Sequence, residues 1–201
     1  MTASGVRNRP IALAIFLIVA GLIGLWASFQ LMVEKIHTLE NPDAVLSCDF
    51  SIILQCGKNL GSAQGAIFGF PNPILGLVGF MAPIVVGAAI VGGARFNSWF
   101  WVTFNVGIAG AFALCLWLAY QSIFNLFTLC PWCMVVWSVT IPMFWAVTLR
   151  NLKVGAIPAP RALRKAATAA YSWVPVITLV GYIIIAIVAQ IQLDVLRYLN
   201  F

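Results

Sequence analysis

Four long stretches without a charged side chain constrain this sequence more than any other feature. No Asp, Glu, Lys or Arg occurs in residues 10–33, 59–94, 96–149 or 166–193. A helix needs about 20 predominantly apolar residues to cross the hydrocarbon core of a bilayer. Only 8% of the residues are charged and 63% are hydrophobic, whereas soluble domains have about 25% charged residues. The sequence therefore predicts an all-α polytopic membrane protein with one compact bundle.

The uncharged stretches divide into five expected spans. The 54 uncharged residues of 96–149 would form a helix roughly 80 Å long, so this stretch must fold back, and the polar cluster at 120–125 is the expected turn. The expected spans are 11–31, 74–91, 99–119, 129–149 and 173–193, with a cysteine-containing loop at 34–70, a basic loop at 150–172 and a single domain over 1–201. Within the first loop, the glycine-rich piece 59–70 is too short to span and is expected to be a short helix or a re-entrant segment. Pro142 is expected to kink the fourth span.

Basic residues are distributed unevenly between the two expected faces. One face carries 8 of the 11 Lys and Arg residues: Arg7, Arg9, Arg95, Arg150, Lys153, Arg161, Arg164 and Lys165. The positive-inside rule then places the N-terminus and the basic loop in the cytoplasm, and the cysteine-containing loop outside. The net charge of +6 is therefore interpreted as a topology signal and not as a sign of nucleic-acid binding. The first apolar run is too long for a cleavable signal peptide and lacks its small-residue cleavage pattern.

Four of the five cysteines fall on the expected outer face. Cys48 and Cys56 lie in the hydrophilic loop, and Cys130-Pro-Trp-Cys133 begins the fourth span. Proline is favoured at the first position of a helix, so this motif is expected to open a helix with Cys130 near its cap. The partial positive charge of a helix N-terminus favours a thiolate over a thiol. The outer face is also the oxidising side of the membrane, where disulfides form and persist.

This arrangement favours a relay of thiol–disulfide exchange. Exchange proceeds by attack of a thiolate on a disulfide sulfur, so a mobile loop pair can pass electrons from a soluble partner to a fixed pair. The fixed pair then needs an acceptor that resides in lipid, and a quinone accepts the two electrons of one dithiol. Two other interpretations remain open. The cysteines could bind structural zinc, although the first pair is spaced more widely than is usual for zinc ligands, or they could form purely structural disulfides.

The motifs resemble those of the vitamin K epoxide reductase family. The matching features are Cys48-Asp49 followed by Cys56, then Ser62, Gly65, the Phe-Pro-Asn-Pro segment with Asn72, and Cys130-Pro-Trp-Cys133. The resemblance covers roughly residues 11–149 and implies a four-helix transmembrane bundle around a quinone pocket, with a peripheral fifth helix. Bacterial members are similar in having five spans, which implies the bacterial inner (plasma) membrane. Some carry a fused thioredoxin-like domain; none is present in this sequence, so a separate redox partner is expected.

The resemblance also implies a role for each cysteine of the two pairs. Cys133 would face the quinone and donate electrons to it, through a charge-transfer or covalent adduct. Cys130 would accept electrons from Cys56. Cys48 would exchange with a periplasmic thioredoxin-fold oxidase. No metal is expected in this chemistry.

Four further residues are expected at the quinone. Asn72 would hydrogen-bond a quinone carbonyl oxygen, although it could instead only shape the turn between its two prolines. Ser62 would lie on the segment that caps the pocket, and Trp132 and Trp137 would line it. In the vertebrate enzymes a tyrosine occupies the position of Trp137, whose indole N–H can donate a hydrogen bond but cannot accept one. This departure favours quinone reduction over epoxide reduction.

The expected function is a membrane thiol oxidoreductase that reoxidises its partner and reduces menaquinone, ubiquinone or vitamin K, in support of disulfide bond formation. The alternative enzyme is a vitamin K epoxide reductase. A transporter would place ionisable residues within its spans, and the expected spans contain none. The unrelated bacterial quinone-coupled disulfide generator has its two cysteine pairs in the opposite order. Cys115 is expected to be a small core residue, His37 a solvated one, and Asp49 either a surface acid or a group that adjusts the Cys48 thiol.

Overall fold

Helices form nearly the whole molecule. The computed structural model describes residues 10–42 and 45–199, and within these ranges it contains no strand, only one isolated bridge between Leu54 and Leu129. Arg7, Arg9 and Asp43, which entered the charge count above, lie outside the described residues. Five described helices are long and apolar enough to cross a membrane, which confirms the prediction of an all-α polytopic membrane protein.

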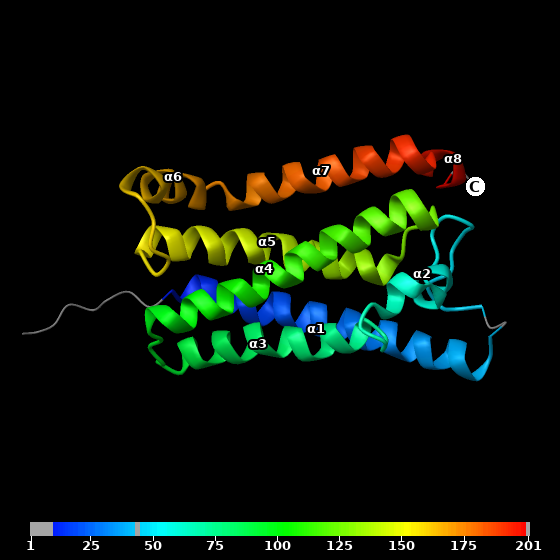
Figure 1. Ribbon diagram of the computed structural model, residues 1–201, viewed down its shortest axis with the longest axis horizontal. Coiled ribbons are helices and arrows are strands. Elements are labelled where there is room, and N and C mark those ends of the chain that lie inside the picture. The colour runs from blue at the N-terminus through cyan, green and yellow to red at the C-terminus, as the bar shows by residue number, and fades with distance from the viewer. Residues whose placement is uncertain (1–9, 43–44, 200–201) are drawn as a thin grey trace, which may run out of the picture.

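The elements follow one another with short connections (Figure 1). They are α1 (Ile11–Glu40), α2 (Gly57–Gly61), the 3-10 turn η1 (Ala63–Ala66), α3 (Pro73–Val91), α4 (Ser98–Tyr120), the π-helical η2 (Gln121–Leu126), α5 (Pro131–Val154), α6 (Arg161–Tyr171), α7 (Val174–Leu193) and α8 (Val195–Leu199). The candidate spans are α1, α3, α4 continued by η2, α5 and α7. The connection between α1 and α3, which contains α2 and η1, covers one end of the bundle (Figure 1).

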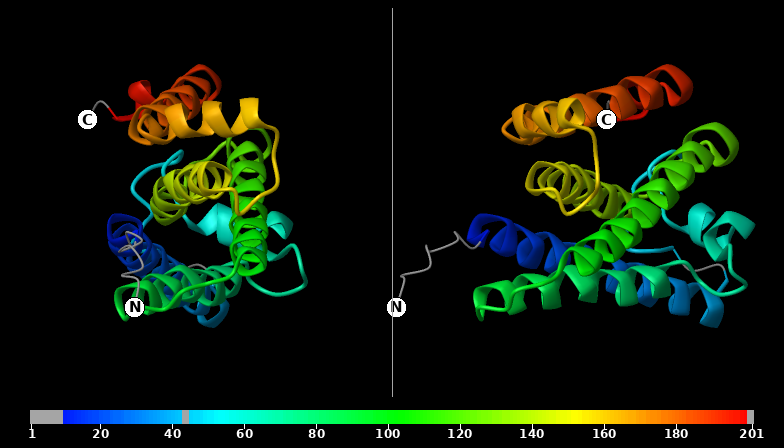
Figure 2. Two further views of the ribbon diagram at one scale, coloured as in Figure 1. Left: turned by 90° about the vertical axis from the view of Figure 1, so that its left-hand side faces the viewer. Right: turned by 60° about the vertical axis from the view of Figure 1, so that its left-hand side comes forward.

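Four of the long helices form the bundle, and the fifth lies outside it. Helix α1 packs against α3 and α5, and α5 packs against α4. Helix α7 packs mainly against α5 and lies on the outer side of it, away from α1 and α3 (Figure 2). Only 11% of the apolar window of α7 is buried, compared with 44% for α5. Most of the α7 surface is therefore left for lipid.

Glycines bring α1 and α3 to backbone contact. A Cβ atom on Gly87 would lie 2.6 Å from the carbonyl oxygen of Ala14, and one on Gly76 would collide with Oγ of Ser28. Only glycine, which has no Cβ atom, fits at these two positions. Small residues at such contacts let membrane helices approach closely, since lipid supplies no hydrophobic driving force between them.

Three segment boundaries differ from those expected. Helix α1 does not end near residue 31 but continues to Glu40, because charged residues mark where a helix leaves the hydrocarbon and not where its hydrogen bonding stops. The expected turn at 120–125 is helical as well, and the chain reverses only at Phe127, whose φ of 51° is left-handed. The expected basic loop contains the eleven-residue helix α6. Pro142 lies inside α5, which continues as one helix on both sides of it.

Candidate functional site

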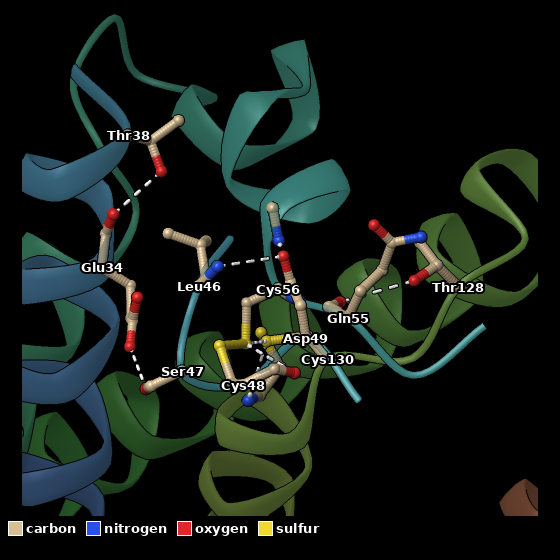
Figure 3. The surroundings of a disulfide bond; sticks show 12 residues. Glu34, Thr38, Leu46, Ser47, Cys48, Asp49, Gln55, Cys56, Thr128 and Cys130 are labelled. Atoms are coloured by element: carbon tan, nitrogen blue, oxygen red, sulfur yellow. Dashed lines mark hydrogen bonds between the residues drawn. A yellow bond between two sulfur atoms is a disulfide. The ribbon is translucent and has the colours of Figure 1, made fainter. Parts of the chain in front are cut away.

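Four cysteines gather at one end of the bundle. Cys48 and Cys56 form a disulfide, and Sγ of Cys130 lies 3.3 Å from Sγ of Cys56 (Figure 3). Cys130 is the N-cap residue of α5, and its sulfur accepts a hydrogen bond from the backbone N–H of Cys133 at 3.4 Å. This is the cap position that the Cys-Pro-Trp-Cys motif predicts. The loop pair and the helix pair are thus close enough to exchange partners after a small displacement.

Backbone hydrogen bonds set this approach. The backbone N–H of Gln55 donates to the carbonyl oxygen of Leu129 at 3.0 Å, and the backbone N–H of Leu129 donates to the carbonyl oxygen of Ile53 at 2.7 Å. The buried hydroxyl of Thr128 donates to the same Ile53 oxygen at 3.0 Å. Cys56 and Cys130 each follow directly after this short bridge. The bridge therefore fixes the position of one sulfur relative to the other.

Asp49 organises the loop between the disulfide-bonded cysteines. Its Oδ1 accepts hydrogen bonds from the backbone N–H groups of Cys56 at 2.7 Å and Gly57 at 3.2 Å, and its Oδ2 accepts one from Leu46 at 3.4 Å (Figure 3). These bonds satisfy backbone donors at the start of α2 that would otherwise lack a partner. Of the two roles left open for Asp49, the geometry shows neither a free surface acid nor a bond to a sulfur, but a carboxylate that braces the backbone.

The extension of α1 anchors the same loop on either side of the disulfide. Glu34 is buried and accepts a hydrogen bond from the hydroxyl of Ser47, next to Cys48. Nζ of Lys35 donates to the carbonyl oxygen of Leu60 at 2.8 Å. Two charged residues that appeared to belong to a solvated loop thus hold the cysteine loop against the bundle.

The cysteine loop is closed over its sulfurs. The exposed fraction is 2% for Cys48 and 0% for both Cys56 and Cys130. These cysteines form one buried cluster with Leu31, Leu46 and Leu60, and Trp132 packs against it. The sequence suggested a mobile hydrophilic loop, and in this conformation the loop closes its two cysteines off from water.

Below this cluster lies a mainly apolar cavity of about 430 Å³, a size typical of small-molecule sites. Residues of α1, α3, α4 and α5 line it, together with the loop that carries η1, and no residue of α7 does. Cys133 and Trp137 of α5 are among the lining residues, as are Ser62 and Asn72. Trp132 is not, so the structure separates it from the other expected quinone contacts. Cys115, expected to be a core residue, is buried but also borders this cavity.

Ser62 and Asn72 shape the wall of the cavity. Oγ of Ser62 donates to the carbonyl oxygen of Asn59 at 2.8 Å and accepts from the backbone N–H of Gly65 at 3.2 Å. Oδ1 of Asn72 accepts from the backbone N–H of Ile67 at 3.1 Å, and its Nδ2 donates to the carbonyl oxygen of Gln64 at 2.7 Å. An amide nitrogen carries two hydrogens, so Asn72 retains a second N–H beyond the bond that fixes the turn.

Asn59 and Ser122 form a polar corner of the cavity that sequence reasoning did not identify. Oγ of Ser122 lies 2.9 Å from Oδ1 of Asn59 and 2.7 Å from the carbonyl oxygen of Thr128. Nδ2 of Asn59 is buried and has no hydrogen-bond partner among the described residues. The pair is separated by 63 positions in the chain. The only signal in the sequence was the presence of single polar residues within uncharged stretches.

His37 lies apart from this site. It borders a second, more polar cavity together with Glu34, Glu40 and Ser47. Residues 10–42 and 45–199 contain no group of three or more His, Cys, Asp or Glu side chains that could hold a metal ion. Cys48 and Cys56 are bonded to each other, and a disulfide sulfur is not the thiolate that zinc requires.

The structure thus combines a bundle of membrane helices, two neighbouring cysteine pairs, and a cavity bordered by Cys133 of the second pair. These features are those of a membrane protein that carries out thiol–disulfide exchange. Residues 15–148 match the sequence profile of the Vitamin K epoxide reductase family, and the chain belongs to this family. No curated protein gives a significant match to the chain. Family membership makes the protein a multi-pass membrane thiol oxidoreductase. Members of the family generally use quinone and act with thioredoxin-like partners.

Proposed function

We propose that this protein reoxidises a periplasmic thioredoxin-fold partner and transfers the two electrons to a membrane quinone, which supports disulfide bond formation. The proposal rests on the arrangement of the cysteines. Sγ of Cys130 lies 3.3 Å from Sγ of Cys56, while Cys133, three residues further on, borders the apolar cavity. The two pairs therefore connect a water-side loop with a space suited to a lipid-soluble molecule.

The outer pair takes electrons from the partner. A thiolate of the reduced partner attacks Sγ of Cys48, the Cys48–Cys56 bond breaks, and Cys56 leaves as a thiolate. The second partner thiolate then attacks the partner sulfur of the mixed disulfide and releases Cys48. The partner becomes a disulfide, and Cys48 and Cys56 become a dithiol that holds two electrons.

The inner pair passes these electrons to the quinone. The Cys56 thiolate attacks Cys130 of a Cys130–Cys133 disulfide and Cys133 leaves; Cys48 then attacks Cys56, which restores the outer disulfide and frees Cys130. The quinone takes two electrons and two protons from the Cys130–Cys133 dithiol, which returns to a disulfide. The described state, with the outer disulfide formed and Cys130 and Cys133 free, corresponds to the protein just before quinone reduction.

The cavity residues give the quinone its orientation in this proposal. The second N–H of Asn72 and the indole N–H of Trp137 are the donors suited to quinone carbonyl oxygens, because both residues border the cavity with Cys133. Neither group is a proton donor in the acid–base sense. Their contribution is to hold the ring beside the sulfur and to stabilise the charge that develops on the quinone oxygens.

The test of this function is a coupled assay of the full chain in proteoliposomes with a reduced thioredoxin and menaquinone or ubiquinone. We expect repeated turnover, with one hydroquinone formed per thioredoxin disulfide, and vitamin K epoxide offered instead of quinone tests the alternative enzyme. Without an acceptor, oxidation of thioredoxin should stop after the protein's own disulfides are consumed. Continued oxidation without hydroquinone, or a Cys48→Ala/Cys56→Ala variant that oxidises thioredoxin like wild type, would contradict the proposal.

The proposed orientation places the cysteine loop in the periplasm, and it rests on the uneven distribution of basic residues. Lys58 and Lys165 are exposed and come from opposite ends of the bundle. We expect a membrane-impermeant maleimide to label Lys58→Cys in intact spheroplasts, whereas Lys165→Cys should react only after the membrane is opened. If only Lys165→Cys is labelled in intact spheroplasts, the protein has the opposite orientation in the membrane.

A further inference from the structure

Acidic side chains are absent from most of this chain. The five Asp and Glu residues occur at positions 34, 40, 43, 49 and 194, so residues 50–193 contain none. Among the described residues, the carboxylates therefore lie at the cysteine end of the bundle: on the last turns of α1, in the cysteine loop, and just after α7 (Figure 1). Residues 1–9 contain no Asp or Glu either.

The opposite end of the bundle is strongly basic. It comprises the turn between α3 and α4, the end of α5 and helix α6 (Figure 1). The exposed cations of this basic end are Arg95, Lys153, Arg161, Arg164 and Lys165. Because no carboxylate of residues 10–42 or 45–199 lies at this end, the described part of the chain supplies no anionic counterion for this cluster. Like charges at one end of a molecule repel one another, and an outside anion reduces this repulsion.

Helix α6 has the geometry of a helix that lies in the membrane surface. In the end-on view its axis runs across the axes of the spans (Figure 2, left). Arg161, Arg164, Lys165 and Thr168 recur at intervals of three and four residues, which places them on one face. The small residue Ala167 is buried on the other face, against the bundle. The bundle thus covers one side of α6, and the exposed basic residues are left at the membrane surface, where Lys and Arg attract anionic headgroups.

Two of these cations also hold helix α6 in place. The guanidinium of Arg164 lies against Gly155, the left-handed C-cap of α5, where a Cβ would come within 3.0 Å of it. A cation is favoured there because the last carbonyl groups of a helix carry partial negative charge. Nζ of Lys153 lies 4.9 Å from the ring centre of Tyr171. Arg161 and Lys165 make no comparable contact with the rest of the described residues, and both are exposed.

We propose that the basic end, with α6 as its platform, is a binding surface for the headgroups of anionic phospholipids in the leaflet at this end of the bundle. The phosphodiester groups supply the counterions that the described residues do not provide at this end. Leu163 and Trp173 are 48% and 61% exposed next to these cations, and apolar and aromatic side chains of this kind insert at the level of the headgroups. Free phosphate offers the charge but no acyl chains for these residues. The bound lipid would hold α6, and through it the start of α7, against the bundle.

The test is the thermal unfolding of the full chain in an uncharged detergent, followed by tryptophan fluorescence. Added phosphatidylglycerol should raise the midpoint temperature of wild type, whereas phosphatidylcholine should not. In Arg161→Gln/Lys165→Gln, the phosphatidylglycerol concentration that gives half of this rise should increase roughly 30-fold, since each Lys or Arg near an anionic surface contributes about fivefold in affinity. High salt should weaken the wild-type response, because it screens exposed charges.

Three comparisons make the result decisive. Lys58→Gln/Arg197→Gln removes the same charge from exposed residues at the cysteine end and should respond to phosphatidylglycerol like wild type. Arg161→Lys/Lys165→Arg keeps the charge and should also keep the response. Equal unfolding temperatures in detergent alone show that the variants fold. The proposal is overturned if the Gln variant at α6 responds like wild type, if phosphatidylcholine acts equally well, or if inorganic phosphate reproduces the effect.

Discussion

Replacing Cys133 by alanine is expected to reduce quinone reduction by roughly a thousandfold or more, the scale of loss seen when a reacting group is removed. Cys133 is the cysteine that borders the cavity, and without it Cys130 cannot form the inner disulfide. The variant should also accumulate a Cys56–Cys130 disulfide. Cys130 lies 3.3 Å from Cys56 and can displace Cys48 from the outer disulfide. Without Cys133, the Cys56–Cys130 bond is resolved only by the return of Cys48 and no longer by formation of the inner disulfide.

Both outcomes can be measured on the same preparation. Hydroquinone formation gives the activity, and mass spectrometry of peptides digested without reductant gives the disulfide pairs. Ser138→Ala is a matched control, because Ser138 lies on the same helix with its hydroxyl on the carbonyl oxygen of Val135, outside the cavity. Its activity should equal that of wild type. A Cys133→Ala protein that keeps activity within tenfold of wild type would remove the proposed role of Cys133.

The second large effect is expected from Gly87→Leu, which should destabilise the fold by about 3 kcal/mol, the upper range for overpacking. The atom that a Cβ on Gly87 would meet is a backbone oxygen of α1, that of Ala14 at 2.6 Å. A backbone atom within a helix cannot move aside as the end of a side chain can. The steric clash is therefore relieved only if α1 and α3 move apart. Residues of both helices line the cavity.

Gly110→Leu provides the control for helix propensity and added apolar volume. Gly110 lies on α4, where a Cβ would meet nothing within 4 Å. We expect this variant to unfold at the wild-type temperature or slightly above it, because leucine favours a helix more than glycine does. Thermal unfolding in detergent compares the two variants. Equal stability of Gly87→Leu and wild type would show that α1 and α3 are not held at backbone contact.

Hydropathy predicted the number of spans well because lipid imposes one strong condition, an apolar stretch of sufficient length. It predicted the ends of the helices poorly. Glu34 and Lys35 are charged and look like loop residues, yet they belong to α1 because each finds a partner in the cysteine loop. The polar residues near 121 look like a turn, yet they continue α4 as η2. Both errors arise because polar and charged residues were taken as a sign that a helix ends.

The candidate site also has features that the sequence predicts and features that it does not. The local structure could be predicted from the motif, since proline is favoured at the first position of a helix and here follows Cys130. The bridge between Leu54 and Leu129, the backbone contacts of Asp49 and the contact of Asn59 with Ser122 join segments distant in sequence or depend on the course of the loop. No single stretch encodes these contacts. The distinction between Trp137 inside the cavity and Trp132 outside it follows from the direction of each side chain on α5, which composition does not reveal.

The burial of Cys48, Cys56 and Cys130 would shield the proposed electron path from other thiols. Small thiols dissolved in the surrounding water cannot attack these three buried sulfurs while the loop is closed, so in the proposed reaction they would not supply electrons in place of the partner. A productive partner must first displace the loop, which makes recognition of its surface a condition for any transfer. Selectivity would then reside in the opening of the loop and not in the reactivity of the sulfur behind it.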